Sequence, residues 1–133
     1  MIRESLDTNV LLRLLMRGEL RSQHEAARKL VETDKVRFFV SDTAINEIVY
    51  ALVVHYKFSR DKVRYAIEAL SRINSIDFNH DLTLAALDLY CSYNSLSFAD
   101  CYMAASAKFM NASPLWTFDR DLAKKAPTAK LLA

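Results

Sequence analysis

Four acidic residues stand beside or inside segments that otherwise consist mainly of apolar residues. They are Asp7, after residues 1–6, Glu47, within residues 44–54, Asp100, before residues 101–110, and Asp119, after residues 115–118. A carboxylate in such a core-forming segment loses hydration, at a cost of several kcal/mol unless a partner compensates it. Mg²⁺ and Mn²⁺ are suitable partners because they prefer carboxylate and water oxygens as ligands. The four acids therefore predict a metal-dependent enzyme.

The length and composition predict one compact domain over residues 1–133, because 52% of the 133 residues are apolar. No stretch approaches the ~18 uncharged apolar residues of a membrane helix. Arg3 and Glu4 interrupt the apolar start, so we expect no secretory signal and no membrane attachment. Cys91 and Cys101 lack the spacing of a zinc site. Two buried-looking thiols are compatible with the reducing cytoplasm, which is the expected location.

The charge balance favours an anionic partner. If four of the 16 acidic residues face a metal, 18 Lys and Arg outnumber the remaining acids, which suits RNA or an acidic peptide. Gly18 is the only glycine, which excludes a P-loop and a dinucleotide-binding fingerprint. A metal ion is then the expected means of binding phosphate.

Apolar patterns and helix-capping residues predict strands that alternate with helices. The expected strands are residues 2–6, 36–40, 76–78, 115–118 and 130–132. The expected helices are residues 10–16, 22–31, a helix capped by 41–43 and running to about 56, a helix capped by 59–61 and including 63–73, and then 81–93, 98–110 and 119–125. Such alternation predicts an α/β sandwich around a mostly parallel sheet.

The predicted topology brings the four acids toward one edge of the sheet. Ligands of such folds collect outside the carboxyl ends of the strands. Asp7 and Asp119 each stand at that end of a predicted strand, while Glu47 and Asp100 lie in the early turns of helices that can start at the same edge. We therefore expect the four carboxylates to converge.

Each acid also has a simpler structural explanation. Asp7 and Asp119 can cap the helices that follow them. Asp100 gains from the positive end of its helix dipole. Glu47 can be half of a buried ion pair with a distant Arg or Lys, although its helix is otherwise almost entirely apolar.

Four short motifs resemble those of the PIN-domain nucleases, and more narrowly those of the VapC-type toxins of toxin–antitoxin pairs. The motifs are L-D-T-N at residues 6–9, N-E-I at 46–48, A-D-C-Y-M-A-A at 99–105 and T-F-D at 117–119. They occur in the family's order and span nearly the whole chain. The resemblance implies a three-layer α/β/α sandwich with a parallel sheet.

The resemblance also implies an endoribonuclease that depends on Mg²⁺ or Mn²⁺. By motif, the acidic cluster corresponds to Asp7, Glu47, Asp100 and Asp119. We expect Asp7, Asp100 and Asp119 to bind the metal directly or through water, and Glu47 to bind it or to orient the attacking water. Asn9 and Thr117 correspond to supporting polar residues, and Thr117 favours Asp119 over the neighbouring Asp121 as the fourth acid. A homodimer and an inhibitory VapB-like antitoxin are the implied protein partners.

Three other interpretations stay open at this stage. A response-regulator receiver domain needs an adjacent acidic pair at the first strand, which Glu4, Ser5 and Asp7 do not supply. A haloacid-dehalogenase-type phosphatase begins D-x-D, whereas Asn9 holds the third position here. The third interpretation is a PIN-like module that only binds RNA or protein. An assay of metal-dependent RNA cleavage by the pure protein separates such a module from a nuclease.

Overall fold

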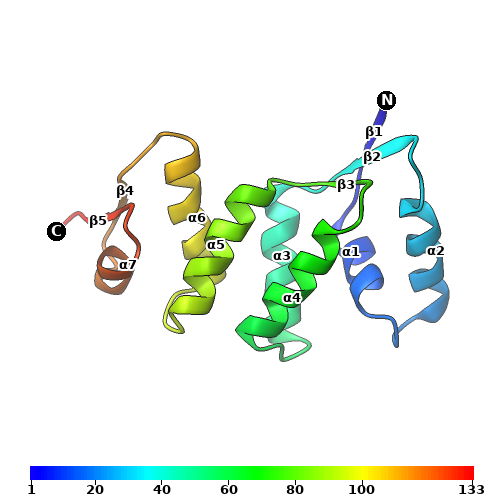
Figure 1. Ribbon diagram of the computed structural model, residues 1–133. Coiled ribbons are helices and arrows are strands. Elements are labelled where there is room, and N and C mark those ends of the chain that lie inside the picture. The colour runs from blue at the N-terminus through cyan, green and yellow to red at the C-terminus, as the bar shows by residue number, and fades with distance from the viewer. The chain divides into compact units, whose positions relative to one another are not determined.

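The computed structural model describes all residues of the chain, Met1–Ala133, as two compact units (Figure 1). Unit 1 is Met1–Phe78 and unit 2 is Asn79–Ala133. The structure has seven helices, none of which is long and apolar enough to cross a membrane.

Unit 1 is built on a three-stranded sheet with the strand order β1-β2-β3. Its elements, in chain order, are β1 (Ile2–Ser5), α1 (Thr8–Leu15), α2 (Arg21–Val31), β2 (Val36–Phe39), α3 (Asp42–Val54), α4 (Arg60–Ser71) and β3 (Ile76–Asp77). Both strand pairs are parallel, and Phe38 of the central strand is in register with Glu4 and Ile76. The side chain of Arg37 joins β2 to β3 by an ion pair with Asp77.

The core of unit 1 explains why its helices take these positions. The most deeply buried side chains are Leu11, Phe38, Val40, Ile45, Ile48, Leu52, Val63, Ile67 and Leu70. On α3 and α4 they recur at helical spacing, so each helix turns one apolar face inward. Helix α1 packs beside α2 and α3 (Figure 1), which places the start of α1 near the start of α3.

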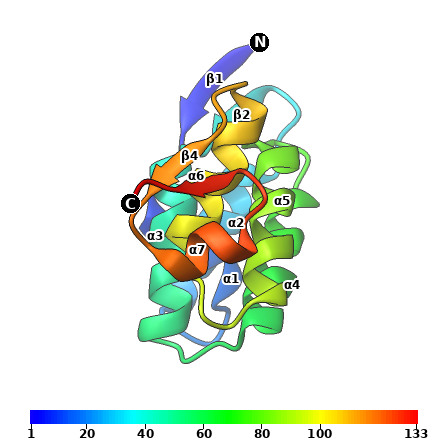
Figure 2. The same cartoon turned by 90° about the vertical axis from the view of Figure 1, so that its left-hand side faces the viewer.

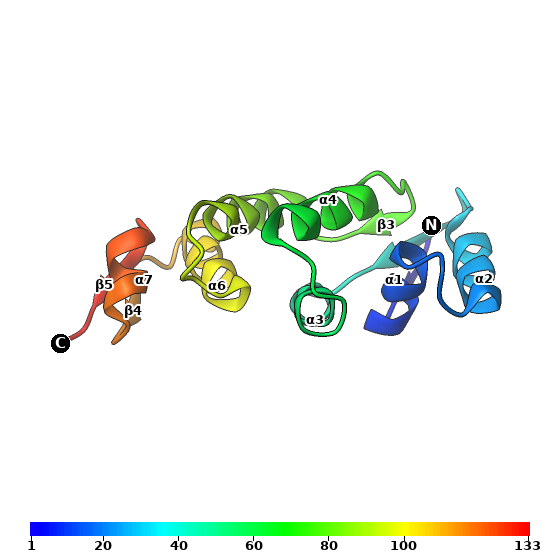
Figure 3. The ribbon, with the colours of Figure 1, turned by 90° about the horizontal axis from the view of Figure 1, so that it is seen from below.

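Unit 2 combines a helix pair with a two-stranded sheet. Its elements are α5 (His80–Ser92), α6 (Phe98–Phe109), β4 (Leu115–Thr117), α7 (Arg120–Lys125) and β5 (Ala129–Leu131). Helices α5 and α6 lie side by side (Figures 1 and 3), and the rings of Tyr90 and Phe98 meet edge to face between them. Strands β4 and β5 are parallel, and α7 packs against both of them (Figure 2).

Local side-chain caps define most of the helix starts. Six of the seven N-cap residues accept a hydrogen bond from a backbone N–H of the first turn; they are Asp7, Ser41, Ser59, Asn79, Ser97 and Asp119. A cap of this kind stabilises a helix by about 1 kcal/mol. Helix α2 is the exception, because it follows Leu20 in a left-handed backbone conformation and has no side-chain cap.

The fold prediction is confirmed at the level of class and element order. Every predicted strand and helix is present, with ends that differ by about one or two residues, as assignments commonly do. All three strand pairs are parallel. Seven helices with parallel strands are consistent with the three-layer α/β/α sandwich that the resemblance implies. A single domain over residues 1–133 stays a prediction.

Candidate active site

Asp7 is held at the carboxyl end of β1 by its role as the N-cap of α1. Its backbone is extended, and its Oδ1 accepts a hydrogen bond from the backbone N–H of Val10 at 3.1 Å. Capping occupies Oδ1 and leaves Oδ2 for another partner, since a carboxylate can accept several hydrogen bonds or bind a cation. The side chain is exposed. Asp7 is therefore both a cap and an accessible carboxylate.

Glu47 lies on α3 and is oriented by a residue that is 39 positions away in the sequence. The hydroxyl of Thr8 donates to Glu47 Oε2 at 2.7 Å. The opposite face of α3 carries the fully buried side chains of Ile45, Ile48 and Leu52, so Glu47 faces outward and is exposed. Glu47 is hydrogen-bonded to Thr8, and the alternative of a buried ion pair is wrong.

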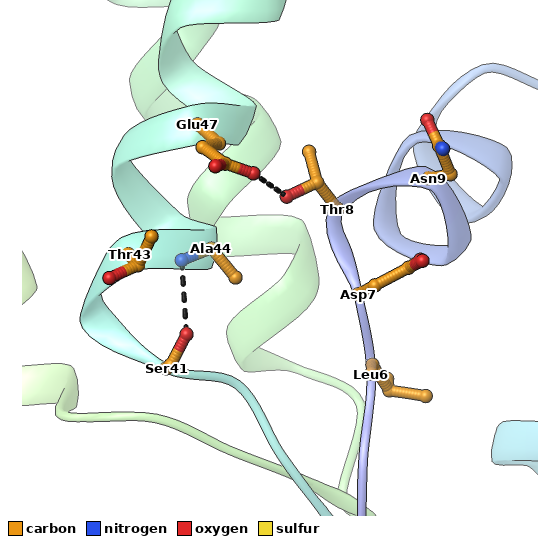
Figure 4. A pocket seen from close by; sticks show the side chains of 8 residues that line it. All are labelled: Leu6, Asp7, Thr8, Asn9, Ser41, Thr43, Ala44 and Glu47. Carbon is orange, nitrogen blue, oxygen red and sulfur yellow. Dashed lines mark hydrogen bonds between the residues drawn. The ribbon is translucent and has the colours of Figure 1, made fainter.

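Asp7 and Glu47 line the same cavity of about 340 Å³ in unit 1 (Figure 4). The lining residues are Leu6, Asp7, Thr8, Asn9, Ser41, Thr43, Ala44 and Glu47. Figure 4 shows Glu47 and Thr8 pointing toward one another, while the Asp7 carboxylate extends to the other side of the chain at Thr8. The cavity thus gathers two carboxylates, three hydroxyls and the Asn9 amide around the ends of β1 and β2.

Asp100 and Asp119 lie at the starts of two helices of unit 2. Asp100 is in the first turn of α6, where its backbone N–H donates to Ser97 Oγ at 3.1 Å. Asp119 caps α7, because its Oδ1 accepts from the backbone N–H groups of Asp121 at 2.9 Å and Leu122 at 3.1 Å. The predicted supporting residue Thr117 accepts the backbone N–H of Asp119 through Oγ1 at 2.9 Å. Asp100 is half-buried and Asp119 is exposed.

Asp121 has a different environment from Asp119. Its Oδ1 lies 2.8 Å from Lys125 Nζ, and its Oδ2 accepts a hydrogen bond from the Ser95 hydroxyl. The hydrogen bond from Lys125 and, to a smaller extent, the one from Ser95 lower the pKa of the Asp121 carboxyl below its ordinary value. The Asp121 carboxylate is therefore engaged on both oxygens.

The burial of the four acids corrects one step of the sequence argument. The expectation that desolvated carboxylates require a compensating cation is wrong for Asp7, Glu47 and Asp119, which are exposed. The physical reason is that Asp7 stands where its strand ends and Glu47 lies on the outward side of its helix, although the adjacent Leu6 and Ile48 are buried. Asp119 lies in a segment that is itself exposed, as are its neighbours Phe118 and Arg120. Within either unit, no group of three or more His, Cys, Asp or Glu side chains is gathered around a common point. Convergence of all four carboxylates stays a prediction.

Thr8 is a site residue that the sequence interpretation missed. It is the first residue of α1, and its hydroxyl reaches across to α3. Ser41 and Thr43 also line the cavity, where Ser41 accepts the Ala44 N–H at 3.1 Å as the cap of α3. The only signal was that Thr8 directly follows Asp7, since nothing local shows which distant residue a hydroxyl will meet.

The donor set of the cavity fits a hard divalent cation. Its polar side chains offer carboxylate, hydroxyl and amide oxygens, with neither thiol nor imidazole among them. Mg²⁺ and Mn²⁺ favour such oxygen ligands and keep several water ligands, so a few protein ligands are enough. The free oxygens of Asp7 and Glu47 are the candidate ligands.

Comparison with known proteins identifies the family of the chain. A family model described as "PIN domain" matches residues 5–127, a range that contains all four acids. No curated protein matches the chain. PIN domains are generally divalent-metal-dependent. The chain belongs to the PIN-domain family, whose members are generally nucleases.

Proposed function

We propose that this protein is a Mg²⁺- or Mn²⁺-dependent endoribonuclease with Asp7, Glu47, Asp100 and Asp119 as its catalytic residues. The observation that carries the proposal is the oxygen-lined cavity of Asp7, Thr8, Asn9 and Glu47 in a chain that matches the PIN family over residues 5–127. The excess of Lys and Arg over the acids outside the proposed site supports an RNA substrate.

The proposed roles follow from the contacts of each side chain. Asp7, Asp100 and Asp119 would hold the divalent ion, which when bound lowers the pKa of a water ligand and stabilises charge on the leaving oxygen. The helix cap engages Asp7 Oδ1, so Oδ2 would be the ligand oxygen of Asp7. Thr8 donates to Glu47 Oε2, so Oε1 would bind the metal ion or accept a hydrogen bond from the attacking water. Asn9, beside them in the cavity, supports this arrangement.

We further infer that the nuclease is the toxin of a toxin–antitoxin pair. Support comes from the motifs L-D-T-N, N-E-I, A-D-C-Y-M-A-A and T-F-D, which resemble the VapC-type toxins in type and order. The proposal includes homodimer formation, a cytoplasmic location and inhibition by a VapB-like antitoxin. A short antitoxin-like reading frame next to the gene, whose product blocks cleavage on co-purification, is the expected finding. If no antitoxin-like gene lies next to this gene and its overexpression does not slow cell growth, the toxin role would be contradicted. The nuclease proposal would then still stand.

A cleavage assay on the purified chain tests the enzymatic proposal. End-labelled RNA and DNA of the same sequence are incubated with the protein in Mg²⁺, in Mn²⁺ and in EDTA. We expect internal cuts in RNA with either metal and none in EDTA. Asp7→Asn should abolish the cuts, and Asp34→Asn is the matched control because Asp34 is an exposed aspartate outside the cavity. Equal cleavage by both variants would refute the assignment of Asp7.

A further inference from the structure

A three-residue polar cluster in unit 2 joins the loop before α6 to the start of α7. Ser95 donates to Asp121 Oδ2 at 2.5 Å, and Lys125 Nζ donates to Ser95 Oγ at 2.5 Å and contacts Asp121 Oδ1 at 2.8 Å. The Tyr93 ring lies beneath the same ammonium group, with its centroid 5.6 Å from Nζ. Each member therefore contacts both of the others, so that the cluster forms a closed triangle.

The cluster is connected to both catalytic acids of unit 2 by short paths. Asp121 donates its backbone N–H to Asp119 Oδ1 at 2.9 Å. On the other side, Ser95 precedes the α6 cap Ser97, whose Oγ accepts the backbone N–H of Asp100 at 3.1 Å. One continuous path of hydrogen bonds and a short loop thus runs from the Asp119 carboxylate to the start of the helix that carries Asp100.

Helix α7 needs external contacts to hold this geometry. It has six residues, and isolated helices shorter than about 12–15 residues are marginal in water. The buried side chain of Leu122 holds α7 against the rest of unit 2. The cap Asp119 and the polar triangle add further contacts at the two ends of the helix. Exposed ion pairs stabilise folds only weakly, so the triangle adds little to the free energy of unfolding.

We propose that Ser95, Asp121 and Lys125 are positioning residues that fix the orientation of Asp119 relative to Asp100 for metal binding. This inference rests on the proposed function, because it assigns the triangle a role toward the proposed ligands. Mutation of residues that hydrogen-bond to metal ligands and orient them typically lowers metal affinity or activity about 10–100-fold.

Two variants break the triangle at different points, and a neighbouring lysine provides the control. Ser95→Ala removes the bridging hydroxyl, and Lys125→Met removes the ammonium group while keeping an unbranched side chain of nearly the same length. Lys124→Met removes the same charge one residue earlier on α7, where the side chain is exposed. Lys125→Arg keeps the charge and tests rescue. The full-length proteins are titrated with Mn²⁺ by calorimetry and assayed for kcat and KM on RNA, and far-UV circular dichroism in EDTA checks the fold.

We expect Ser95→Ala and Lys125→Met to raise the Mn²⁺ dissociation constant about tenfold or more. In these two variants kcat should fall, while KM for RNA should stay within about twofold of the wild-type value. Lys125→Arg should recover most of the Mn²⁺ affinity and most of kcat. Lys124→Met should resemble wild type. Wild-type Mn²⁺ affinity in both disrupted variants, or an equal loss in Lys124→Met, would overturn the positioning role. A wild-type protein that neither binds Mn²⁺ nor cleaves RNA would instead overturn the proposed function itself. If Lys125→Met unfolds, Ser95→Ala decides the question because it removes one exposed hydroxyl.

Discussion

Replacing Glu47 by Gln separates a role in metal-dependent catalysis from a role in folding. Glu47 is exposed and accepts one hydrogen bond from Thr8 at 2.7 Å. An amide oxygen can accept the same bond, and a typical hydrogen bond contributes only about 0.5–1.5 kcal/mol. We therefore expect Glu47→Gln to change the free energy of unfolding by less than about 1 kcal/mol in EDTA. A buried ion pair broken on one side would cost about 3–5 kcal/mol.

The effect of Mn²⁺ on the same variant reports the metal role. A ligand at 100 times its dissociation constant stabilises the native state by about 2.7 kcal/mol. If loss of the Glu47 charge weakens Mn²⁺ binding tenfold, the same concentration gives only about 1.4 kcal/mol. The expected signature is a nearly unchanged free energy in EDTA and a Mn²⁺ increment that is smaller by roughly 1.3 kcal/mol.

Urea unfolding followed by far-UV circular dichroism measures both quantities, because the free energy extrapolates linearly to water. Each protein is unfolded in EDTA and at one fixed Mn²⁺ concentration, and RNA cleavage is assayed in parallel. Glu32→Gln is the matched control, since Glu32 is also exposed and hydrogen-bonded, in this case to Arg28 at 2.8 Å. A loss of 3 kcal/mol or more in EDTA with an unchanged Mn²⁺ increment would show that Glu47 is structural.

Four further predictions follow from the same structure. Asp7→Asn and Asp100→Asn should each abolish RNA cleavage with the far-UV spectrum unchanged, and wild-type rates in both would refute their catalytic role. Mg²⁺ or Mn²⁺ should raise the unfolding midpoint and Ca²⁺ should bind without supporting cleavage, because its coordination is larger and looser; no response to any ion would remove the metal site. Thr8→Val should slow cleavage more than Thr8→Ser, which keeps the donor to Glu47; equal rates would mean that this bond has no catalytic role. Ile48→Ala should cost about 2–5 kcal/mol in urea unfolding because Ile48 is fully buried, and a cost under about 1 kcal/mol would contradict the described core.

Helix starts and strand positions were predictable because their causes are local. Ser41, Ser59 and Ser97 satisfy backbone N–H groups within three residues, so a cap can be identified from the sequence alone. Alternation of short apolar segments with amphipathic helices likewise restricts the chain to an α/β fold. Asp7 and Asp119 were predicted to follow strands and to be able to cap helices. Both are N-caps in the structure, because each accepts a backbone N–H of the helix that follows it.

Exposure of the acids could not be predicted from their neighbours. Glu47 shares its helix with Ile45, Ile48 and Leu52, which are fully buried, yet its own side chain faces outward. Burial is decided by which surface another element covers, and that depends on packing between segments that are distant in sequence. The local pattern therefore overestimated the desolvation of the carboxylates.

Local sequence patterns were enough to predict the fold class, the element order and the candidate acids. The partners of these acids depend on how distant segments of the chain pack. Thr8 reaches Glu47 across 39 residues, and Ser95 reaches Asp121 across 26 residues, which distinguishes Asp121 from the cap Asp119. Hydrogen bonds act only over a few ångströms, so contacts between such distant positions exist only once the chain has packed.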